Sequence, residues 1–108
     1  MAAEPTGDEL VELFAALAHP IRLRIVATLS GGRDYVSHLA RVIGISRPLL
    51  HMHLAKLEAA GVVTGTREIS EDGKAMRYVE LADLDLHLTP AMLVVAAATL
   101  AVPNPPKE

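Results

Sequence analysis

The chain contains no cysteine and no tryptophan, and its aromatic residues are one phenylalanine and two tyrosines. Without cysteine it can form no disulfide, no thiolate metal site and no thiol redox sensor. Few aromatic side chains also means few platforms on which the bases of single-stranded nucleic acid could stack. These absences leave an aliphatic chain of 108 residues, enough for one domain with a small core.

Signals for export, membrane insertion and catalysis are missing as well. The first ten residues are acidic and lack the positive-then-apolar pattern of a signal peptide. The apolar stretch at residues 93–102 is too short to span a bilayer. The sequence contains neither a nucleophile–base arrangement nor a glycine-rich phosphate loop. We therefore expect a cytoplasmic protein that is not an enzyme and makes no membrane contact.

Residues 34–61 are the most informative stretch, because they predict two helices joined by a three-residue turn. Gly44 suits the positive φ found just past the end of a helix. Ser46 can cap the second helix, and Pro48 fits its first turn. Each helix has one apolar face, formed by Val36, Leu39, Ala40 and Ile43 in the first and by Leu50, Leu54 and Leu57 in the second. This pattern predicts a helix-turn-helix, whose second helix can enter the DNA major groove.

The flanking segments extend this pair to a winged helix. The other predicted elements are helices at 8–17 and 20–29, strands at 62–70 and 74–81, and a last helix at 91–101. Asp72 and Gly73 form a strong hairpin turn signal between the strands. The predicted fold is therefore mainly α with a β-hairpin, a winged helix-turn-helix. The expected divisions are a disordered lead-in at 1–7, the winged domain at 8–102 and a proline-rich tail at 103–108.

The net charge of −3 conceals a basic centre. Residues 1–19 carry four acidic side chains and no lysine or arginine, whereas residues 20–61 carry six basic side chains against two acidic ones. Positive charge is therefore concentrated on the helix-turn-helix. This distribution, more than the net charge, is what indicates a surface for DNA phosphates.

Candidate DNA contacts lie on the outer face of the second helix and on the hairpin. The predicted DNA-binding residues are Ser46, Arg47, Pro48, His51, Met52, Lys56, Arg67, Lys74 and Arg77. Winged helices also serve as protein-interaction modules, and this is the alternative function. An acidic or apolar outer face would favour the alternative, whereas the face here is basic and polar.

Three segments, at residues 13–29, 43–63 and 72–81, resemble the ArsR/SmtB family of bacterial and archaeal winged-helix transcriptional regulators. The resemblance implies a repressor-type homodimer that is joined through its first and last helices and reads a near-palindromic operator in double-stranded DNA. The expected dimer interface comprises Leu10, Leu13, Phe14, Leu17, Leu93, Val94, Ala97 and Leu100.

The same resemblance defines which metal sites to look for. Metal-sensing relatives often carry a Cys-x-Cys pair where this chain has Tyr35 and Ser37. Asp85 and His87 have the spacing of one half of a last-helix metal site, but the other half would fall at 93–100, which contains no ligand. Three possibilities stay open: Ni²⁺ or Zn²⁺ held with ligands from another subunit, an effector-binding partner protein, or no effector.

Overall fold

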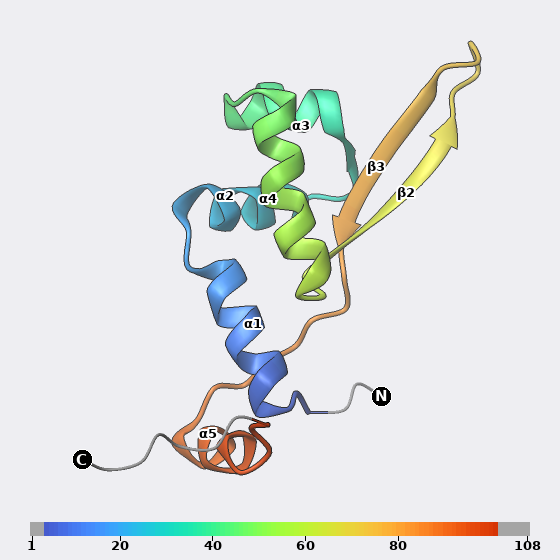
Figure 1. Ribbon diagram of the computed structural model, residues 1–108. Coiled ribbons are helices and arrows are strands. Elements are labelled where there is room, and N and C mark those ends of the chain that lie inside the picture. The colour runs from blue at the N-terminus through green and yellow to red at the C-terminus, as the bar shows by residue number, and fades with distance from the viewer. Residues whose placement is uncertain (1–3, 102–108) are drawn as a thin grey trace.

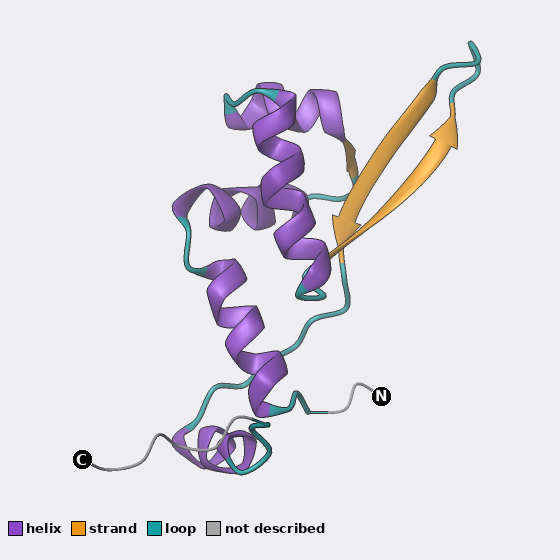
Figure 2. Ribbon diagram, viewed as in Figure 1, coloured by secondary structure: helices purple, strands orange, loops and turns teal. Residues whose placement is uncertain are grey.

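The structure is a computed structural model that describes residues 4–101, a helical body from which a hairpin wing projects (Figure 1). The helices are α1 (Gly7–Leu17), α2 (Pro20–Leu29), α3 (Val36–Ile43), α4 (Arg47–Ala59) and α5 (Pro90–Ala97). The strands are β1 (Asp34–Tyr35), β2 (Val63–Ile69) and β3 (Ala75–Leu81). Helix α5 lies beside the start of α1, at the end of the molecule away from the wing (Figure 2).

The core lies where α2, α3 and α4 meet the base of the wing. Its fully buried aliphatic side chains are Ile25, Leu39, Leu50, Leu54, Leu57, Val62, Val63 and Val79. Both predicted apolar faces of the helix-turn-helix contribute to this set. Each buried side chain of this size stabilises the fold by about 1.5–3 kcal/mol. Packing on one side of α4 leaves its opposite side to solvent.

The helix-turn-helix has the predicted local geometry. Gly44 adopts φ 84°, and its N–H donates to the carbonyl of Ala40 over 2.8 Å. The hydroxyl of Ser46 accepts a hydrogen bond from the Leu49 N–H at 3.3 Å and so caps α4. His19 caps α2 in the same way, because its Nδ1 accepts from the Ile21 N–H at 3.1 Å. The predicted turn and the predicted Ser46 cap are confirmed.

The wing belongs to a three-stranded antiparallel sheet in the order β1-β3-β2, whereas only a hairpin was predicted. Asp34 pairs with Val79 and Tyr35 pairs with Tyr78, so β1 is fixed by its pairing with β3. A strand of two residues has too little alternation to be recognised from sequence. Helix α3 consequently begins at Val36, two residues into the predicted stretch.

Both terminal helices differ from their predicted ends. Helix α1 begins at Gly7 rather than Asp8, because Thr6 and Glu9 form a capping box before it. Helix α5 ends at Ala97 instead of continuing to Ala101. Residues 1–3 of the expected lead-in and the whole expected tail lie outside the described residues. No helix within residues 4–101 is both long enough and apolar enough to cross a membrane.

Candidate nucleic-acid interface

The outer face of α4 carries the predicted DNA-binding side chains in the open. Arg47, His51, Met52 and Lys56 are all exposed. Leu50, Leu54 and Leu57 on the opposite side are fully buried. Because one side of α4 is anchored in the core, the side chains on its other side are already accessible to a partner without a rearrangement. Its first turn also offers the positive end of the helix dipole, next to Arg47.

The wing places its three predicted basic residues in two different settings. Arg67 and Lys74 are exposed along the projecting part of the hairpin. Arg77 is half-buried and turns back toward α4, where its Nη1 lies 3.2 Å from Nδ1 of His51. Its Nη2 donates to Oε1 of Glu58. Arg77 was predicted as a DNA contact on the hairpin together with Arg67 and Lys74, but the structure places its guanidinium against α4, which is the predicted recognition helix.

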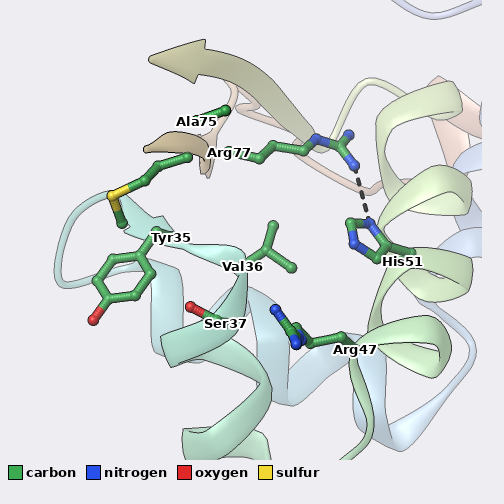
Figure 3. A pocket seen from close by; sticks show the side chains of 8 residues that line it. Tyr35, Val36, Ser37, Arg47, His51, Ala75 and Arg77 are labelled. Carbon is green, nitrogen blue, oxygen red and sulfur yellow. Dashed lines mark hydrogen bonds between the residues drawn. The ribbon is translucent and has the colours of Figure 1, made fainter. Parts of the chain in front are cut away.

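Arg47, His51 and Arg77 surround one hollow of about 240 Å³ between α3, α4 and β3 (Figure 3). Tyr35 and Ser37 line its other side, together with Val36, Ala75 and Met76. No acidic side chain lines this hollow. Three nitrogen-bearing side chains around a concave, acid-free surface favour an anionic partner or one rich in hydrogen-bond acceptors.

Sequence reasoning gave no role to several residues around the wing. Glu58 pairs with Arg77, and Arg33 pairs with Glu68 on β2. The Arg33 guanidinium also lies 4.2 Å from the ring centre of Tyr78. Glu58 stands seven residues after His51, which is two helical turns, so their shared face could have been read from spacing. The pairing of Glu58 with Arg77 and of Arg33 with Glu68 could not have been predicted from spacing, because the partners come from distant segments.

His53 lies on the buried side of α4, beside its leucines, and is a structural histidine. It is only 2% exposed, and its Nδ1 accepts a hydrogen bond from Nε of Arg22 at 3.1 Å. Its ring meets that of His19 edge to face, with 4.7 Å between centroids. Burial, followed by the neighbouring His19 and Arg22, holds the pKa of His53 below its ordinary value. Arg22 is thereby engaged in the core rather than available to DNA.

A family model described as a helix-turn-helix domain matches residues 17–66. The transcriptional regulator CmtR of Mycobacterium bovis is 34% identical over 102 residues, which covers 94% of this chain and 80% of that protein. The chain belongs to the ArsR/SmtB family. These relatives are transcriptional regulators, not enzymes.

Other relatives of this ArsR/SmtB-family chain match it over a shorter stretch. The biofilm growth-associated repressor of Xylella fastidiosa is 37% identical over 68 residues, and the repressor SmtB of Mycobacterium tuberculosis is 43% identical over 76 residues. These matches cover 63% and 70% of this chain. The chain spans 60% of the first relative and 53% of the second.

Solved structures agree on the fold of this ArsR/SmtB-family chain. The repressor BigR from Xylella fastidiosa has TM-score 0.57 at 33% identity, covering 83% of this chain and 79% of that one. A homodimeric winged helix-turn-helix domain from Mycobacterium bovis, a possible ArsR-family regulator, has TM-score 0.63 at 23% identity, with coverage of 84% and 74%. At 23% identity, the match to the Mycobacterium bovis domain supports the fold alone.

The residues predicted to join two ArsR/SmtB protomers differ in their exposure within a single chain. Leu10 and Leu13 lie in the core of the single chain, so they are not free to form an interface. Leu17 is half-buried. The exposed apolar side chains of α1 and the α5 region are Val11, Phe14, Leu93, Val94, Val95 and Leu100. Val11 and Val95 were not predicted, and Ala97 joins Phe14 and Leu93 in lining an apolar groove between the two helices.

The predicted metal pair lies on the extended segment between β3 and α5. His87 Nε2 and Asp85 Oδ1 are 3.2 Å apart, and both side chains are more than four-fifths exposed. Within residues 4–101, no three histidine or acidic side chains are grouped so that they could hold a metal ion. Two exposed ligands on one chain are an incomplete site for Ni²⁺ or Zn²⁺, which take four or more.

Proposed function

We propose that this chain is a sequence-specific repressor of transcription that binds double-stranded DNA as a homodimer. The observation that carries the proposal is that Arg47 and His51, on the solvent side of α4, share one hollow with Arg77 of β3, while the other side of α4 is anchored in the core. Arginine and histidine donors on a helix of this kind suit acceptor-rich base edges in the major groove. Family membership supports the same conclusion.

The wing extends this contact to the backbone of the duplex. Lys74 and Arg67 lie on the hairpin that projects past α4, where they would meet phosphates rather than bases (Figure 1). Ser46 and Pro48, at the start of α4, would bring the helix N-terminus to a phosphate. Met52 and Lys56 complete the surface further along α4.

The homodimer follows from apolar surface that one chain does not cover. Phe14 and Leu93 are exposed and line the groove between α1 and α5, and Val94 is exposed beside Leu93 on α5. A second copy placed there by a two-fold axis would cover the same residues on both chains. Two recognition helices related in this way call for half-sites separated by about 10 base pairs or a multiple, which is a near-palindromic operator.

We propose two sources for a regulatory signal. Asp85 and His87 could hold Ni²⁺ or Zn²⁺ only with ligands from another chain, and an effector-binding partner protein is the other source of a signal. Calorimetric titration of Ni²⁺ into the wild type and into His87→Ala decides between them. Tight binding lost in the variant supports the metal, whereas binding that survives the substitution rules out this pair.

Selection of bound duplexes from a random DNA pool tests the main proposal. We expect a near-palindromic consensus. Arg47→Ala should weaken binding to it most, whereas Lys74→Ala should weaken all sequences alike and lower the salt slope by about one. A chain that enriches no sequence and shifts no duplex at low salt would instead be a protein-interaction module.

A further inference from the structure

Glu58 lies near the end of α4, yet its side chain faces the wing instead of solvent. It is 30% exposed, and its Oε1 accepts a hydrogen bond from Nη2 of Arg77. Nη1 of the same guanidinium lies 3.2 Å from Nδ1 of His51 (Figure 3). One arginine of the wing therefore bridges two residues of the recognition helix that are two turns apart.

The contact with Arg77 determines which ring nitrogen of His51 carries the proton. An arginine side chain has donors only, so Nδ1 of His51 must be the acceptor in this contact. In the neutral ring the proton then resides on Nε2. That second nitrogen lies on the side of the ring that faces the hollow (Figure 3). His51 therefore presents an N–H donor to whatever enters, and its acceptor nitrogen is already occupied.

Gly65 on β2 makes room for the bridge. A Cβ at this position would lie 3.1 Å from Oε1 of Glu58 and 3.2 Å from Nε and Nη2 of Arg77. The backbone of β2 thus passes close over the charged pair without a side chain. The half-buried pair is less exposed to water and salt than an ordinary surface pair, so the attraction between its two charges is screened less.

We propose that Glu58 is a positioning residue for base recognition. Through Arg77 it holds His51 as a fixed N–H donor, which selects a base edge bearing an acceptor, such as N7 or O6 of guanine, over the amino group of cytosine. The selected base rests on the proposed function, whereas the orientation of His51 is a property of the free protein. Arg77 accordingly acts on sequence preference through His51, whereas Arg67 and Lys74 are the wing residues placed to meet phosphates.

Substituting Glu58→Gln in the full chain tests the proposal, and Glu68→Gln is the matched control. Both changes remove one negative charge from the wing region, so both should raise affinity for random DNA alike. Glu68 pairs with Arg33, and so its loss leaves the bridge to α4 in place. Only Glu58→Gln should reduce discrimination at the one base pair per half-site that His51 contacts, by about fivefold.

Gly65→Ala provides a second variant in which every charge is kept. Its added methyl crowds the same pair from β2, and we expect the same loss at the same base pair, to a smaller extent. Equal base preferences in Glu58→Gln and Glu68→Gln would overturn the proposal. Loss of discrimination spread over all positions would also overturn it, because that result indicates a displaced α4 instead of a misdirected histidine.

Nitrogen NMR of the free protein separates this proposal from the proposed function. The His51 ring should show the Nε2–H tautomer alone in the wild type and in Glu68→Gln, and a tautomer mixture in Glu58→Gln. A proton on Nδ1 in the wild type would overturn the bridge, whatever the DNA experiments show. If the NMR result holds and no DNA sequence is selected, the failure belongs to the proposed function.

Discussion

The two ends of the molecule are organised by different forces. At the α3, α4 and wing end, charged and polar side chains fix one another, as Arg77 does with Glu58 and as His38 Nδ1 does with Asp34 Oδ2 at 2.6 Å. At the α1 and α5 end, the two helices pack closely through apolar side chains, with a few hydrogen bonds such as that from the Gly7 N–H to the Thr99 hydroxyl. A Cβ on Gly7 would lie 2.4 Å from the carbonyl oxygen of Ala96.

This difference indicates what each end can offer a partner. The polar end is complete within one chain and presents directed donors, so its binding should depend on salt and on sequence. The apolar end leaves side chains such as Val94, 71% exposed, without cover in one chain. Its association should depend little on salt. We therefore expect substitutions at the polar end to leave dimerisation unchanged. Substitutions at the apolar end should affect DNA binding only because the dimer is needed for full affinity.

Val94→Asp should give the largest effect, because it places a charge on the apolar surface. We expect a monomer whose affinity for the selected operator is about 100-fold lower, since the second half-site is no longer tethered. The monomer should remain folded, because Val94 is exposed in the single chain. Light scattering and operator titration measure the two effects. Leu23→Asp, an exposed apolar position on α2, is the control and should stay dimeric.

Gly7→Ala should come next, with a loss of about 1–3 kcal/mol in the free energy of unfolding. Its methyl would meet the Ala96 carbonyl oxygen, and a backbone atom cannot turn aside as a side chain can. Gly31→Ala is the matched control, because its nearest neighbour would be 3.9 Å away. Urea unfolding measures both variants. Equal stability of the two would show that α1 and α5 are not tightly packed.

The caps of α4 and α5 allow a balanced comparison of the two ends. Ser46 and Thr89 each accept one backbone hydrogen bond, from Leu49 and Met92. Ser46→Ala and Thr89→Ala should each cost about 1 kcal/mol of stability. Ser46→Ala should weaken operator binding by a saturated dimer, and Thr89→Ala should raise the dimer dissociation constant. The comparison fails if both variants change the same quantity.

Acid should lower the free energy of unfolding through His53. Because a single proton is involved, we expect this to be the smallest of the effects. Burial lowers the pKa of His53 from 6.5 in the folded chain, so the unfolded chain takes up this proton more readily. Its contribution to stability is therefore full above about pH 6.5 and is lost as the pH falls below it. His53→Gln should flatten the pH dependence of the urea midpoint. His87→Gln, at an exposed site, should leave it unchanged.

Features set by local chemistry were predictable from the sequence. Gly44, Ser46 and the leucine face of α4 fix the turn and the orientation of the recognition helix within a few residues of chain. The exposed position of Arg47 and His51 followed from that face. These are the parts of the site for which neighbouring residues alone decide the geometry.

Features set by contacts between distant segments were not predictable. Strand β1 forms because Tyr35 pairs with Tyr78 on β3, and a strand of two residues is too short to be recognised from its sequence pattern. Helix α5 stops early where the Thr99 hydroxyl donates to the Ala96 carbonyl and accepts from the N–H of Gly7, 92 residues away in sequence. The contact between Arg77 and Glu58 was not predicted either, because it depends on how the hairpin packs against α4.

The bond between Gly7 and Thr99, 2.7 Å long, also has a practical use for labelling. Together with the 3.0 Å bond from the Ala101 N–H to Asp8 Oδ2, it gathers the two ends of the described chain beside one groove. A fluorophore on Val11 would therefore report association between copies. A probe at the exposed Glu71, in the turn between β2 and β3 at the far end of the wing, would report arrival of a duplex (Figure 1). One doubly labelled protein could then time the two events independently.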